Sequence, residues 1–169
     1  MMGRSRMRAV NTSAIFTTNS DKTISAFATL RFVGDALDPN EISEALKQKP
    51  KGAYRRGEPY RPGLRSPELI GKTGLWYFST DRVIPSKDLG DHLDTLIRLT
   101  APFADDGKRL RTLREIMERE NLQAHVTCFW RGFPGAKEPS IPTVATETFA
   151  RLGAGFETDF DTEAEPPRC

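Results

Sequence analysis

Stretches in which apolar and polar residues alternate constrain the fold most, because a period of two is typical of a strand with one buried face. The clearest are ISAFATLRFV (24–33) and LQAHVTCFW (122–130). GFETDFD (155–161) alternates in the same way, and the bulky run TGLWYFSTD (73–81) predicts a strand inside a sheet. The sequence therefore predicts a sheet of about four to five strands.

Helical patterns separate these predicted strands. Asp38 followed by Pro39, with Glu41 three residues after the cap, is a helix-start signal and predicts a short helix over 39–47. Ser86 is expected to open a helix over 87–99, where Leu89, Leu93, Leu96 and Ile97 form an apolar stripe. Further helices are predicted over 106–121 and 142–152.

The order of these elements predicts two strand–helix–strand units joined by a helical hairpin. The expected fold is a two-layer α+β domain, with a mostly antiparallel sheet and helices packed on one face, loosely ferredoxin-like and pseudo-twofold. We expect the domain to cover residues 23–161. Residues 1–22 are expected to form a disordered tail, and residues 162–169 a disordered acidic one.

The motifs "GDALDPNEISEAL", "GLWYFSTD", "LGDHLDTLIRL" and "LGAGFETDF", in this order, resemble the bacterial family known as domain of unknown function 4279. The resemblance spans roughly residues 24–161. It implies a small intracellular bacterial α+β domain, and it carries over no activity, cofactor or catalytic residue.

A basic tract, KQKPKGAYRRGEPYRPGLR (47–65), follows the first predicted helix. Seven of its nineteen residues are basic and only Glu58 is acidic, although the net charge of the whole chain is +2. Its prolines and glycines argue against a helix or a central strand, so we expect a long loop over 47–72. The candidate binding residues are the cations and tyrosines of the tract: Lys47, Lys49, Lys51, Tyr54, Arg55, Arg56, Tyr60, Arg61 and Arg65.

Groups suited to catalysis are few. His92 is expected to pack its ring at the edge of the core with a nitrogen exposed, and His125 and Cys128, three positions apart on a strand, should leave opposite faces of the sheet. Cys128 is therefore interpreted as a small buried apolar residue. The acidic row Glu157, Asp159 and Asp161 fits a solvated strand face. No spacing predicts a metal site, and the sequence predicts no cofactor and no catalytic residue.

The aromatic run 75–78 leaves two readings open. One face has to pack against the helices and takes either Trp76 and Phe78 or Leu75 and Tyr77, and the other pair is then half-exposed. Exposed aromatic residues on a sheet can stack on RNA bases, but core packing is the favoured interpretation.

Three functions follow as hypotheses. The favoured one is a non-enzymatic, cytoplasmic protein-binding module of the immunity or antitoxin type. Its expected partner is another protein, and an acidic protein would fit the basic tract. The alternative is nucleic-acid binding through residues 47–65 and the Arg-rich start, and the third is an enzyme using His92 or His125 in a pocket beside the 52–73 loop. No membrane partner is expected, and the oligomeric state is left open.

Overall fold

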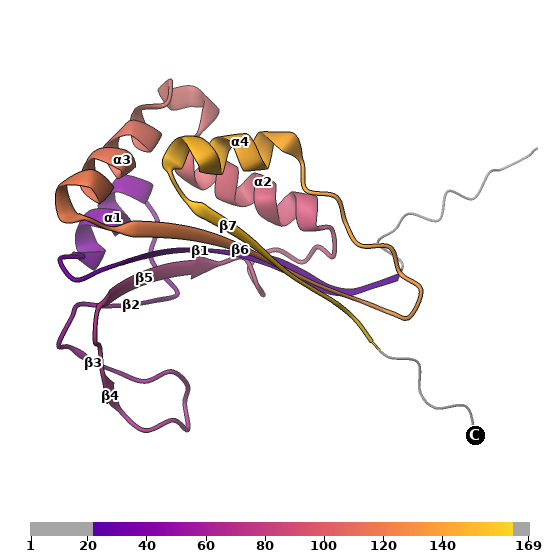
Figure 1. The fold of residues 1–169 in the computed structure, drawn as a ribbon, viewed down its shortest axis with the longest axis horizontal. Helices are drawn as coiled ribbons and strands as arrows, with labels where there is room; N and C mark the ends of the chain where they lie inside the picture. The colour runs from indigo at the N-terminus through magenta and orange to yellow at the C-terminus, as the bar shows by residue number, and fades with distance from the viewer. Residues whose placement is uncertain (1–21, 164–169) are drawn as a thin grey trace, which may run out of the picture.

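The structure, a computed structural model, describes residues 22–163 of the 169-residue chain. The predicted tails fall almost wholly on residues 1–21 and 164–169, outside the described part. Across the described residues, helices cover a five-stranded sheet from one side (Figure 1). The elements are β1 (Thr23–Gly34), α1 (Pro39–Leu46), β2 (Gly52–Tyr54), β3 (Pro59–Tyr60), β4 (Leu69–Ile70), β5 (Gly74–Ser79), α2 (Leu89–Thr100), α3 (Lys108–Glu120), β6 (Gln123–Gly132), α4 (Thr143–Leu152) and β7 (Gly155–Thr162).

The five strands lie in the order β2-β5-β1-β6-β7. β1 is central and pairs antiparallel with β5 and with β6, and β2 pairs antiparallel with β5. The predicted two-layer α+β fold is confirmed. The two strand–helix–strand units match in element order but differ in strand direction, because β6 and β7 are parallel whereas β1 and β5 are antiparallel.

The core lies between the sheet and the helices, and alternation in the strands supplies half of it. Ala28, Leu30 and Phe32 of β1 and Val126 and Cys128 of β6 are fully buried. The helices contribute much of the rest. Leu93 and Leu96 belong to the apolar stripe predicted for 87–99, and Leu113 of α3 and Phe149 of α4 are also fully buried. On β5, Trp76 and Phe78 take the buried side, so Leu75 and Tyr77 are the half-exposed pair.

The start of α1 follows the predicted capping pattern. Asp38 has extended backbone angles, and its Oδ1 accepts a 2.9 Å hydrogen bond from the Asn40 amide, a cap that stabilises a helix by about 1 kcal/mol. Glu41 differs from the expectation, because its carboxylate pairs with Arg119 of α3. The start of α2 also differs, since Asp88 is the cap and the Ser86 hydroxyl accepts from the Asp88 amide.

The predicted loop over 47–72 contains regular structure, so that expectation was incomplete. β2 forms an edge of the main sheet, where one side of its backbone needs no partner. β3 and β4 form a separate two-stranded ladder, in which Pro59 lies opposite Ile70. We call residues 57–71 the arm. Its base is closed by bonds from the Gly57 amide to the Gly71 carbonyl and from the Gly71 amide to the Glu58 carbonyl, of 2.8 and 2.9 Å.

Within residues 22–163 the structure contains no helix that combines the length and the apolar character needed to cross a membrane.

Candidate functional site

All four α-helices pack on the same side of the sheet, so the other side is left without a helical cover (Figure 1). The arm, with β3 and β4, projects from that side (Figure 1). We call this surface the open face. Because side chains alternate along each strand, its residues are those between the buried ones: Ser25, Phe27, Thr29, Arg31 and Val33 of β1, Leu75 and Tyr77 of β5, Gln123, His125, Thr127, Phe129 and Arg131 of β6, and Glu157, Asp159 and Asp161 of β7.

A groove of about 520 Å³ lies between the arm and the open face. Its walls contain Tyr54, Tyr60 and Tyr77, which are the three tyrosines of the whole chain. Lys51 and Arg61 line the same groove. Tyrosine and arginine are enriched in protein interfaces, because each combines a large contact area with hydrogen-bonding groups.

Close packing fixes the tyrosine rings. A Cβ added to Gly52 would lie 2.5 Å from Cε1 of Tyr77, and one added to Gly71 would lie 2.6 Å from Cδ2 of Tyr54. Both glycines therefore give the rings room to lie on the backbone. Tyr54 also stacks on Tyr60, with ring centroids 4.1 Å apart and planes 15° from parallel. Burial, and then hydrogen bonding to Tyr60, raise the pKa of Tyr54, so the phenol stays neutral.

The middle of the open face carries a second aromatic pair. Phe27 of β1 and Phe129 of β6 lie directly opposite each other in the antiparallel register. Their rings stack at 4.6 Å, with planes 18° from parallel, and both side chains remain partly exposed. Such a pair on the uncovered side of a sheet is apolar area available to a partner.

The far edge of the open face is acidic. Phe156 and Phe160 of β7 contact Phe149 and Trp130 on the helical side. The alternating residues Glu157, Asp159 and Asp161 therefore point to the open face, and all three are exposed. The row has the solvated position that its spacing predicted.

The structure brings together only some of the predicted binding residues. Tyr54, Tyr60, Lys51 and Arg61 meet in the groove. Arg55 and Arg56 instead bind carboxylates of the turn before α1, at 2.7 Å each from Asp38 and Asp35.

The remaining cations of the tract divide into paired and unpaired ones. Lys51 lies 3.9 Å from Asp81, and Arg61 lies 3.7 Å from Glu68. Lys47, Lys49 and Arg65 are exposed, and among the described residues they have no carboxylate partner. Ion pairs this exposed contribute at most about 1 kcal/mol, so a partner can replace them.

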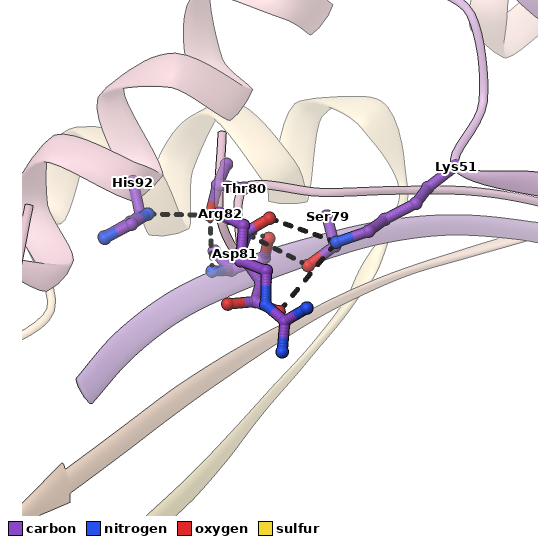
Figure 2. A network of polar contacts seen from close by, with 7 residues as sticks. Lys51, Ser79, Thr80, Asp81, Arg82 and His92 are labelled. Carbon is purple, nitrogen blue, oxygen red and sulfur yellow. Dashed lines mark hydrogen bonds and ion pairs between the residues drawn. The ribbon is translucent and has the colours of Figure 1, made fainter. Parts of the chain in front are cut away.

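His92 corrects an expectation, because it lies inside the core and only 1% of it is exposed. Figure 2 shows the ring pointing at Thr80, with Nδ1 2.8 Å from the hydroxyl oxygen. Nε2 is 2.9 Å from the Ser86 carbonyl, which can only accept, so in the neutral ring Nε2 carries the proton and Nδ1 can only accept. The single proton of the Thr80 hydroxyl then has two acceptors within reach, Nδ1 of His92 at 2.8 Å and the Ala28 carbonyl at 3.1 Å. The Ala28 amide donates to the same hydroxyl oxygen at 2.9 Å, so these groups join β1, the end of β5 and α2.

His125 and Cys128 point away from each other, as predicted. Cys128 is fully buried among apolar residues, and burial raises the pKa of its thiol to about 12. His125 is half-buried on the open face. Its Nδ1 lies against Gly155 and has no hydrogen-bond partner within residues 22–163. His125 therefore does not contact Cys128 and cannot activate its thiol as a nucleophile.

Searching residues 22–163 for three or more His, Cys, Asp or Glu side chains placed to hold a metal ion finds no such group. The residues that sequence reasoning missed are Phe27 and Phe129. The sequence did contain a signal for them, because each is an aromatic residue at a strand position where the alternation calls for a polar one.

The sequence model of the family described as "Domain of unknown function (DUF4279)" matches residues 22–164 of this chain. No curated protein and no solved structure matches the chain.

Proposed function

Since this chain belongs to the family described as a domain of unknown function (DUF4279), which assigns no activity, we propose from its own surface that it is a protein-binding domain. The recognition surface in this proposal is the open face together with the arm. The observation that carries it is the position of Tyr77 and of the Phe27–Phe129 pair on a sheet side that no helix in the described chain covers.

The exposed apolar residues of the arm support the proposal. Leu64 is completely exposed, at 103% of its reference area, and Ile70 is 62% exposed. With the partly exposed Leu69, they extend the apolar area of the open face away from the sheet. Apolar side chains that project from a domain beside a groove are typical of interaction sites.

Charge favours a protein over a nucleic acid as the partner. Four of the seven cations in the tract 47–65 already lie within 4.0 Å of a carboxylate of the same chain. The same face also carries Glu157, Asp159 and Asp161, which would repel a phosphate backbone. A protein surface can complement a face with both signs, and a toxin bound by an immunity-type protein is one partner of this kind.

The test compares exposed apolar positions on the two sides of the molecule. Leu64→Asp and Ile70→Asp remove arm contacts without touching the core, and Val144→Asp on α4 is the matched control, because Val144 is 57% exposed. A tagged chain is purified from its native cells, and bound proteins, including an untagged second copy, are quantified. We expect a stoichiometric partner to be retained by the wild type and the control and lost from both arm variants. Equal retention by all four chains would refute the proposal.

A further inference from the structure

The groove between the arm and the open face is rich in hydrogen-bond donors. The described residues that line it supply three phenols, the Lys51 ammonium and the Arg61 guanidinium, and none of them is Asp or Glu. Arg61 lies 3.7 Å from Glu68, which is beyond the range of a hydrogen bond, so the N–H groups of its guanidinium are available to a ligand. A ligand that matches the groove therefore presents acceptors and needs few acceptors in return.

The groove is also close to electrically neutral. Both cations that line it have a carboxylate within 4.0 Å. The arm carries two arginines, Arg61 and Arg65, and two glutamates, Glu58 and Glu68, so its net charge is zero. A phosphate backbone or another anion would gain little attraction here, since the cations are already balanced. The complementary ligand is neutral, rich in acceptors and poor in donors.

The aromatic walls of the groove are fixed in place. Tyr77 lies on Gly52 and Tyr54 lies on Gly71, and the missing glycine side chains give both rings their room. Tyr60 stacks on Tyr54 at 4.1 Å. The hydrogen bond between these two phenols uses one of their two protons, so the other proton remains for a ligand, together with that of Tyr77. Rigid rings around about 520 Å³ form a prebuilt site of ordinary ligand size.

A proline-rich segment has the properties that this groove requires. Each proline lacks an N–H but keeps its carbonyl, and polyproline II has no internal hydrogen bonds, so its carbonyls are free to accept. Such segments dock in aromatic-lined grooves, and their preformed conformation lowers the entropy lost on binding. An added β-strand fits less well, because its N–H groups need acceptors and β2 offers only three residues for pairing.

We propose that the groove binds a proline-rich segment of the partner protein. The proline rings pack on the three tyrosines, and the carbonyl groups accept hydrogen bonds from the phenols and from Arg61. The exposed Leu64 and Ile70 of the arm contact the partner beside this segment. This inference rests on the proposed function and names the kind of segment that the partner presents.

Displayed peptides test the class of ligand. Three libraries of peptides about twelve residues long carry proline, alanine or glutamate at two fixed positions, one turn of polyproline II apart, with the other positions random. Each library is selected on the full chain. The recovered peptides are synthesised, and their Kd is measured by fluorescence polarisation at about 50 and about 500 mM salt.

Three variants locate the binding site. Tyr77→Ala removes a ring of the groove, Tyr77→Phe removes only its hydroxyl, and Arg61→Ala removes the guanidinium. Arg61 is exposed, so its substitution tests the groove even where Tyr77→Ala disturbs the sheet. Phe133→Ala is the control, because that ring is 48% exposed and lies outside the groove. Circular dichroism checks the fold of each chain.

We expect the proline library to be enriched at least about tenfold over the other two, with Kd below about 100 μM. Salt should change this Kd by less than about twofold, because recognition does not depend on charge. Tyr77→Ala should weaken binding at least about tenfold. Tyr77→Phe and Arg61→Ala, which remove donors, should weaken it about three- to tenfold, and the control should bind as the wild type does.

Three results would overturn the inference. The first is equal enrichment of the proline and alanine libraries. The second is a preference for the glutamate library with an affinity that falls as salt is added, which would mean that the groove recognises carboxylates. The third is equal affinity of the proline peptides for the wild type and all three variants. A cellular partner that is lost on Leu64→Asp, without enrichment of the proline library, would refute the proline-rich segment and leave the proposed function standing.

Discussion

Tyr54 on β2 stacks on Tyr60 on β3, with ring centroids 4.1 Å apart, so an aromatic contact fixes the arm to the edge of the sheet. Both rings also line the groove, so the contact is part of its wall.

Replacing Tyr60 with Ala should loosen the arm while the domain stays folded. An aromatic pair of this kind contributes about 0.5–1.5 kcal/mol, and it holds only residues 57–71 against the sheet. Hydrogen exchange at the amides of Gly57 and Gly71, which close the base of the arm, should become faster in the variant. Phe103→Ala is the control, since that ring is fully exposed and removing it should leave exchange unchanged. Unchanged exchange in Tyr60→Ala would show that the stack does not fix the arm.

Thr80→Val should destabilise the domain by about 1–3 kcal/mol, measured by urea unfolding. The substitution keeps the shape but leaves the Ala28 amide and Nδ1 of His92 without their buried partner. Thr112→Val, at a half-buried position of α3 whose hydroxyl makes a solvent-exposed bond to a carbonyl of its own helix, should cost less than about 0.5 kcal/mol. Nitrogen NMR of His92 should show the proton on Nε2, and a proton on Nδ1 alone would contradict the hydrogen-bond assignment.

Cys128 should not react with thiol reagents in the folded protein, in a Cys169→Ser background that leaves it as the single thiol. Its pKa is raised to about 12 by burial, from an ordinary value of 9.0, so the native thiol stays protonated at pH 8. Because the folded pKa is the higher one, the stability linked to this thiol is complete below about pH 9 and is lost as the pH rises toward 12. Labelling at the same rate in native and urea-unfolded protein would contradict the buried position.

Asp38→Ala should destabilise the domain by about 1 kcal/mol, whereas Asp38→Asn should keep most of the cap. The Asn40 amide is the main cause that holds the pKa of Asp38 below its ordinary value, and Arg55 adds to it. Since the folded pKa is the lower one, this contribution is present above about pH 4 and is lost as the pH falls through the folded value. Glu44→Ala, an exposed position on the same helix, serves as the control. A loss of the same size in both Ala variants would show that the cap contributes nothing.

Much of the fold was predictable because strand alternation and helix spacing are local signals. The buried phase of β1 and β6 follows from the sequence alone, as does the cap at Asp38. A mostly antiparallel sheet was predicted, but the strand order and the parallel pairing of β6 with β7 were not, because they depend on contacts between residues far apart in the chain. The arm was missed for a related reason, since each strand of its ladder has only two residues, too few for periodicity to be visible.

Some residues of the candidate surface could be predicted from the sequence and others could not. The basic tract identified Tyr54 and Tyr60, but Tyr77 could be assigned to the open face only after the structure placed Trp76 in the core. The charges of Arg55 and Arg56 suggested recognition, whereas their carboxylate partners lie 17 and 21 residues away, beyond the reach of a local pattern.

The central claim is that the open face, and not the helical side, contacts a partner. The most direct measurement places a photo-crosslinking amino acid at Tyr77 in the native cells, with Val144 of α4 as the control position. The account predicts one dominant protein adduct from position 77, a second copy of this chain or another protein, and none from position 144. Adducts from position 144 with none from position 77 would contradict it.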